Sequence, residues 1–308
     1  TEMAKIQKIL AATDLSSSSS QAIDRGFLIA KTNGAEYIVM HAVGIDALSS
    51  LREFLGENVD AVSEKIVDEA RGRLTEMVAC SPARDDVTAD LQVELGLAAS
   101  AISSFSETAG VDLLLVGAHG SGFFQRMVLG STASRLLRKS KCPVLVVKQE
   151  AHRSYKRVLI AADFSPGSEF TIRIARAVAP EADIVLLHVF DVPFEGKMQY
   201  AGVSEAVIHQ YRIEARARAT QQLHDLARTA GLSAGDYSGI VVHGDATRNI
   251  VEHEEKYRCD LIVMGKHGTH VTEELLLGSV TKRVLAESRS DVLVVVDKRH
   301  PDVLRITP

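Results

Sequence analysis

The sequence predicts two tandem α/β domains, each a doubly wound fold built on a five-stranded parallel sheet. Two observations lead to this prediction. A long internal repeat runs through the chain, and inside each copy short apolar runs alternate with longer amphipathic segments. The length of 308 residues fits two domains, because a domain usually holds roughly 100 to 200 residues.

The internal repeat defines the domain organisation. Gly117 and Gly265 each follow an apolar run of nearly the same sequence, and 265 − 117 gives an offset of 148 residues. The matching reaches both ends of each copy at offsets of 147 to 149. We therefore expect domains at 1–148 and 155–308, joined by the polar stretch 148–154, which we expect to lack core residues.

The elements of the first copy are expected in the order βαβαβαβαβ. Short runs rich in Val, Ile and Leu predict strands that are buried on both faces, at residues 6–12, 37–41, 87–93, 113–116 and 144–147. Apolar residues three and four positions apart predict helices at residues 18–32, 60–78, 98–108 and 132–139. Right-handed crossovers then give a doubly wound sheet, and ligands bind such sheets beyond the carboxyl ends of the strands, at the switch point.

A glycine motif follows the fourth strand of each copy. It reads Gly117-x2-Gly120-x9-Gly130-Ser131 in the first copy and Gly265-x2-Gly268-x9-Gly278-Ser279 in the second. Glycines let backbone amides approach a ligand closely, and the final Gly-Ser opens a helix whose free N–H groups favour an anion such as phosphate. The alternative is that these glycines only form turns.

An aspartate ends the first strand of each copy. The carboxylates of Asp14 and Asp163 are expected at the same sheet edge as the glycine motif, where they can accept hydrogen bonds from a ribose or an adenine amino group. The alternative is that they only cap the helices that begin near Ser18 and Ser168.

These features together resemble a tandem universal stress protein, with two domains of the UspA-like family in one chain. The resemblance rests on Asp-x-Ser after the first strand, on a histidine that ends the second strand (His41, His188), on the glycine motif and on the closing Val-Leu-Val-Val strand. In that family the glycine motif marks the members that bind ATP. The resemblance implies ligand contacts from Asp14, Ala42, Gly117, Gly120, Gly130 and Ser131 in the first copy, and from Asp163, Val189, Gly265, Gly268, Gly278 and Ser279 in the second.

The resemblance implies a regulatory module that binds ATP, ADP or AMP, with or without Mg²⁺, at both sites. It also implies that the closing strands, 144–147 and 292–295, pair with each other, and that the protein forms a homodimer. One alternative is a structural or interaction dimer with vestigial pockets. Another is an enzyme of the wider adenine nucleotide alpha hydrolase-like group, for which no signature loop is present, so any ATP hydrolysis is expected to be slow.

Composition argues against several other classes. A net charge of −5 and the lack of Trp disfavour a nucleic-acid-binding face, and no apolar run approaches the roughly 18 residues of a membrane span. Three scattered cysteines form no disulfide framework, so we expect a cytoplasmic protein. The histidines of the second copy lack Cys or carboxylate partners at a recognised spacing and do not predict a metal site, and His41 and His188 are expected to be hydrogen-bonded structural residues.

The two copies differ in charge. The nine-residue part of the glycine motif holds Arg126 in the first copy and Glu273-Glu274 in the second, which predicts a mild preference of ATP for the first site. Before the closing strand, the second copy has Ser290-Asp291 where the first has Cys142-Pro143.

Overall fold

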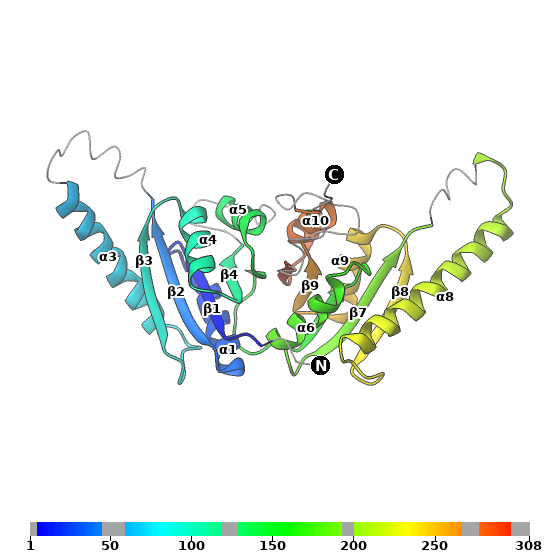
Figure 1. Ribbon diagram of the computed structural model, residues 1–308, viewed down its shortest axis with the longest axis horizontal. Coiled ribbons are helices and arrows are strands. Elements are labelled where there is room, and N and C mark those ends of the chain that lie inside the picture. Colours follow the sequence, from blue (N-terminus) through cyan, green and yellow to red (C-terminus); the bar gives the residue numbers. More distant parts are fainter. Residues whose placement is uncertain (1–4, 45–58, 119–128, 193–199, 267–276, 297–308) are drawn as a thin grey trace, which may run out of the picture. The chain divides into compact units, whose positions relative to one another are not determined.

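The computed structural model describes residues 5–44, 59–118, 129–192, 200–266 and 277–296 (Figure 1). They group into two compact units. The first unit contains Lys5–Ser154 together with the strand that begins at Asp291, and the second contains Tyr155–Ser290. Both units are α/β structures with mostly parallel strands, which confirms the predicted fold class.

The sheet of the first unit is centred on the first strand of the chain. Its strands are β1 (Lys8–Thr13), β2 (Glu36–Val43), β3 (Ala89–Leu95), β4 (Leu113–Gly117), β5 (Val144–Val147) and β10 (Asp291–Val295). They lie in the order β3-β2-β1-β4-β5-β10, and all neighbours are parallel except β5 and β10, which are antiparallel. The pairing of the two closing strands that the resemblance implied is therefore present.

The helices of the first unit are α1 (Ser17–Asn33), α3 (Val59–Ala79), α4 (Ala98–Thr108) and α5 (Ser131–Lys139). All the predicted strands and helices of this copy are found, with ends within two residues of the expected ones. Helix α1 packs on β1 and β4, and it ends at Gly34, whose left-handed φ of 61° is the usual glycine termination of a helix. This packing fixes the start of α1 beside the carboxyl end of the sheet.

The second unit repeats the central part of this arrangement. Its strands are β6 (Arg157–Ala161), β7 (Asp183–Phe190), β8 (Tyr237–His243) and β9 (Leu261–Gly265), in the order β9-β6-β7-β8 and all parallel. Its helices are α6 (Ser168–Val178), α8 (Glu205–Thr229), α9 (Ala246–Tyr257) and α10 (Ser279–Glu287). Figure 1 shows the long helix α8 beside β8, as α3 lies beside β3 in the first unit.

In both units, a carboxylate at the start of the fourth strand fixes the first strand at its amino end. Asp112 accepts hydrogen bonds from the backbone N–H groups of Gln7 (2.9 Å) and Lys8 (3.1 Å). Asp260, 148 residues later, does the same for Lys156 (2.9 Å) and Arg157 (3.0 Å). These bonds hold the first strand of each copy in register with the fourth. The carboxyl ends of the two strands therefore lie side by side.

The stretch 148–154 differs from the expectation that it lacks core residues. Ala151 is only 5% exposed, and the carbonyl of Arg153 accepts a hydrogen bond of 2.7 Å from the guanidinium of Arg25. The polar composition of this stretch hid the fact that its backbone is fixed against α1.

The cysteines give a test of this packing. Cys80 is exposed, whereas Cys142 and Cys259 are buried, and burial raises the pKa of the Cys259 thiol to about 12. Because the thiolate is the reactive form, we expect Cys80 alone to react rapidly with an aromatic disulfide reagent at about pH 8. The other two thiols should react only after unfolding. The Cys80→Ser variant should lose the fast phase, and a second fast equivalent in the native protein would contradict the structure.

Candidate functional site

The candidate sites lie at the switch point of each unit. Strand β1 has β2 on one side and β4 on the other, so the chain changes direction across the sheet between β1 and β4. Asp14 directly follows β1, and Gly117 ends β4. Asp163 after β6 and Gly265 at the end of β9 repeat this arrangement in the second unit. Each unit thus brings its aspartate and the first glycine of its motif to the same end of two neighbouring strands.

The two aspartates brace the loop that follows the first strand. Oδ1 of Asp14 accepts hydrogen bonds from the backbone N–H (3.1 Å) and the hydroxyl (2.5 Å) of Ser16. Oδ1 of Asp163 accepts from the N–H of Ser165 (3.0 Å) and the hydroxyl of Ser168 (2.8 Å). The alternative role as helix caps is wrong, because the cap residue of α1 is Ser16 and that of α6 is Gly167.

The residue after each aspartate has a strained backbone. Leu15 has a φ of 62° and Phe164 a φ of 59°, in the left-handed region that bulky side chains rarely adopt. Such strain costs roughly 1 to 3 kcal/mol and clusters at functional sites. The same strain at equivalent positions of both copies indicates that the carboxylate must be held at one defined place.

A histidine ends the second strand of each copy and contacts the first strand. Nδ1 of His41 donates to the carbonyl of Thr13, and Nδ1 of His188 donates to the carbonyl of Ala162, both at 2.8 Å. Because a carbonyl can only accept, Nδ1 carries the proton. Burial lowers the pKa of His188, against the raising effects of the Ala162 carbonyl and Asp163, so this ring is neutral at pH 7 with an acceptor at Nε2. The interpretation of both as hydrogen-bonded structural histidines is confirmed.

The second unit adds an aromatic contact that the sequence interpretation missed. The Phe164 ring stacks on His188 with centroids 4.0 Å apart and an angle of 29°. The first copy has Leu15 at the position of Phe164. This difference inside the Asp-x-Ser motif was the available signal, but the stacking partner lies 24 residues away (188 − 164) and follows only from the pairing of β6 with β7.

The end of each glycine motif opens a helix without a side-chain cap. Gly130 precedes α5 and Gly278 precedes α10, and their N–H groups donate back to the carbonyls of Ala118 (2.9 Å) and Lys266 (3.1 Å). These bonds close the loop at its base. Neither helix has an acidic residue in its first turn, and Ser131 and Ser279 are exposed there. The first-turn N–H groups of both helices can therefore donate hydrogen bonds to an anion.

A lysine lies within the second motif. Lys266 directly follows Gly265 and is only 5% exposed, whereas the first copy has Ala118 at this position. This lysine is a further difference between the two motifs, beside Arg126 and Glu273-Glu274.

The remaining predicted residues fall into two groups. Ala42 lies near the end of β2 and Val189 near the end of β7, both half-buried, one strand away from the aspartates. Gly120 and Gly268, together with Arg126 and Glu273-Glu274, lie outside the described residues.

Within the described ranges, no group of three His, Cys, Asp or Glu side chains is placed to hold a metal ion. The helices in those ranges include none that is both long and apolar enough to cross a membrane.

Comparison with known proteins gives matches in both halves of the chain. The model of the universal stress protein family matches residues 5–148 and again 154–296. The universal stress protein MJ0577 of Methanocaldococcus jannaschii is 29% identical over 47% of this chain and 96% of its own length. A universal stress protein of Mycolicibacterium smegmatis is 30% identical over 67% of this chain and 68% of its own length. The crystal structure of one from Archaeoglobus fulgidus has a TM-score of 0.62 at 20% identity, covering 94% of this chain and 97% of its own.

Proposed function

Since the chain belongs to the universal stress protein family and contains two tandem domains of it, we propose that it binds an adenine nucleotide in each domain and acts as a regulatory module of the stress response. One observation carries the proposal. In both copies, the braced aspartate and the first glycine of the motif lie at the carboxyl ends of two neighbouring strands. Cys80, Cys142 and Cys259 form no disulfides, which supports a reducing compartment such as the cytoplasm.

The aspartates suit the ribose part of a nucleotide. In Asp163 both hydrogen bonds from the loop go to Oδ1, which leaves Oδ2 as the atom that would accept from a ribose hydroxyl. The backbone of Ala42 and of Val189, one strand away, would contact the adenine. A fixed carboxylate loses little conformational freedom on binding, so its hydrogen bond would contribute fully to affinity.

The glycine motifs suit the phosphates. The first intrahelical bond of α5 runs from the N–H of Ser134 to the carbonyl of Gly130 (2.9 Å), so the amides of residues 131–133 precede it. These amides and the Ser131 hydroxyl would hold phosphate oxygens, as would Ser279 at the start of α10. Any Mg²⁺ would enter bound to the phosphates, since the described residues offer no metal cluster of their own.

The proposal predicts that each aspartate controls one site. In a calorimetric titration with ATP we expect two sites in the unmodified chain. Asp14→Ala and Asp163→Ala should each weaken one of them by about tenfold to a hundredfold, because a hydrogen bond to a charged group contributes about 1.5 to 3 kcal/mol. Comparing ATP with AMP in the two variants tests whether the first site is preferred for the triphosphate.

Asp225→Ala is the matched control, because Asp225 lies on an exposed face of α8 and should leave both affinities unchanged. Native mass spectrometry of freshly purified protein gives an independent measurement of bound nucleotide. Protein that arrives empty and also ignores millimolar ATP would contradict the proposal and favour the interaction-dimer alternative.

A further inference from the structure

The pairing of β5 with β10 is centred on equivalent residues of the two copies. Leu145 lies opposite Leu293, and 293 − 145 equals the repeat offset of 148. On either side, Val144 faces Val294, the equivalent of Val146, and Val146 faces Val292, the equivalent of Val144. The pairing therefore has a local two-fold pseudosymmetry. By backbone hydrogen bonding alone, the β5 edge would accept the β5 strand of a second copy of this chain in the same register.

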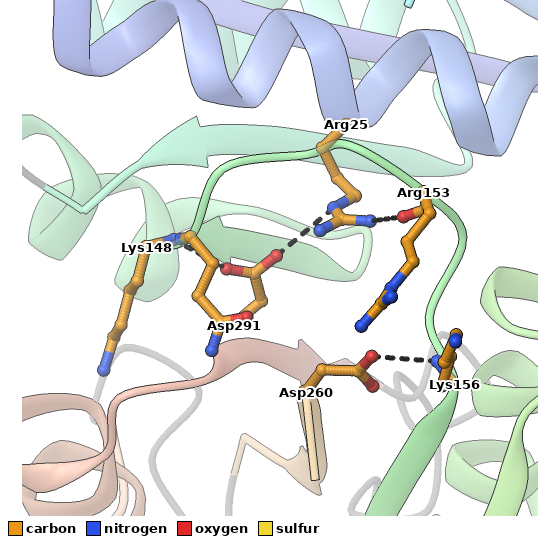
Figure 2. A network of polar contacts seen from close by, with 7 residues as sticks. Arg25, Lys148, Arg153, Lys156, Asp260 and Asp291 are labelled. Carbon is orange, nitrogen blue, oxygen red and sulfur yellow. Dashed lines mark hydrogen bonds and ion pairs between the residues drawn. The ribbon is translucent and has the colours of Figure 1, made fainter. Parts of the chain in front are cut away.

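A buried ion pair breaks this symmetry. Nε of Arg25, on α1, lies 3.3 Å from Oδ2 of Asp291, the first residue of β10, and the side chains are only 4% and 0% exposed (Figure 2). Oδ1 of Asp291 accepts hydrogen bonds from the backbone N–H groups of Lys148 (2.7 Å) and Gln149 (3.0 Å), just beyond β5. The carboxylate thus connects β10 to both α1 and the end of β5.

The equivalent positions in the repeat carry no charge. Pro143 stands 148 residues before Asp291, and Ile174 stands 149 residues after Arg25, at the offset of the Asp14 and Asp163 loops. If β5 paired with the β5 strand of a second protein chain, the pseudosymmetry would bring Pro143 of that second chain to the place of Asp291. The Arg25 guanidinium would then be buried without its carboxylate, which is strongly unfavourable.

We propose that the Arg25–Asp291 pair makes the β5 edge selective, so that it accepts β10 and rejects the β5 strand of a second copy. Backbone hydrogen bonds and apolar side chains would stabilise the pairing of β5 with either strand. The ion pair forms only with β10, so it makes the free energy of that pairing more favourable, and specificity is such a difference in free energy. The proposal is independent of nucleotide binding.

A single cysteine at the pseudosymmetry centre reports the wrong pairing. The background chain carries Cys80→Ser, Cys142→Ser and Cys259→Val, so Leu145→Cys introduces its single cysteine. This cysteine can form an interchain crosslink only where residue 145 of one chain meets residue 145 of another chain. The repeat itself supplies two of these replacements, since Ser290 and Val111 are the equivalents of Cys142 and Cys259. A short bifunctional thiol reagent and a denaturing gel measure the interchain fraction.

We expect that fraction to stay minor while Arg25 and Asp291 are intact. It should rise by about tenfold or more when Arg25→Ile and Asp291→Pro introduce the uncharged residues that stand at the equivalent positions of the repeat, because the selective term is then lost. Tethering favours β10 in every variant, so the ratio between variants is the informative quantity.

Asp291→Asn provides a second test should the double variant fold poorly. Its amide oxygen can still accept from Lys148 and Gln149, but it offers Arg25 no charge in either pairing, so the interchain fraction should also rise. Circular dichroism checks the fold. An interchain fraction that stays the same across folded variants would overturn the proposal, and so would a high fraction in the chain with the ion pair intact.

Discussion

Arg25→Met is expected to lower the free energy of unfolding of the first unit by about 3 to 5 kcal/mol, because it leaves the Asp291 carboxylate buried without its cation. The carboxylate keeps the N–H donors of Lys148 and Gln149, but these do not neutralise it. The carbonyl of Arg153 also loses its donor. The loss is larger than for an exposed pair, since water and salt screen surface charges.

Urea unfolding with thiol labelling measures this effect unit by unit. Cys142 is buried in the first unit and Cys259 in the second, so their labelling midpoints report the two units separately. We expect Arg25→Met to shift the midpoint of Cys142. The control is Lys31→Met on the same helix, which removes the exposed partner of Asp85 and should cost less than about 1 kcal/mol. A midpoint of Cys142 that moved no further than in this control would contradict the expectation.

The fold was largely predictable because the relevant signals are local. Runs such as Leu113–Val116 contain only residues that favour buried strands, and the repeat showed each pattern twice. The positions of Asp14 and Gly117 followed from the rule that parallel strands end at one sheet edge.

The less predictable features depend on contacts between residues far apart in sequence. The stack of Phe164 on His188 requires the pairing of two strands, and the partner of Asp291 lies 266 residues before it (291 − 25). The sequence revealed the change from Pro143 to Asp291, but no local pattern indicates that Arg25, in the middle of an amphipathic helix, points into the protein. A charged residue in an amphipathic helix usually lies on the solvent face, whereas tertiary packing buries Arg25.

Gly26→Ala is expected to destabilise the first unit by about 3 kcal/mol. A Cβ atom at residue 26 would lie 2.3 Å from the hydroxyl oxygen of Tyr37 and 2.5 Å from its Cζ, far inside normal contact distances. The ring cannot move aside easily, because it is buried, its hydroxyl donates to the carbonyl of Ile23 (2.8 Å), and it packs edge-on against Phe27. Overpacking of this kind outweighs the helix propensity of alanine, which favours the substitution by about 1 kcal/mol.

Gly72→Ala on α3 is the matched control. It is also a glycine inside a helix, but nothing lies within 4 Å of the added Cβ, so we expect it to stabilise the protein by up to about 1 kcal/mol. Thermal and urea unfolding of both variants give the two free energies. A Gly26→Ala variant as stable as Gly72→Ala would show that α1 and β2 are less closely packed than the structure indicates.

The repeat predicts how the overpacked variant can be rescued. The second copy has Ala175 at the position of Gly26 and Ile184 at the position of Tyr37, so a larger helix residue is accompanied by a smaller strand residue. Gly26→Ala combined with Tyr37→Ile should therefore be less destabilised than the sum of the two single changes. Duplication preserved the fold, while contacting residues changed together, so each copy provides the compensating substitution for the other.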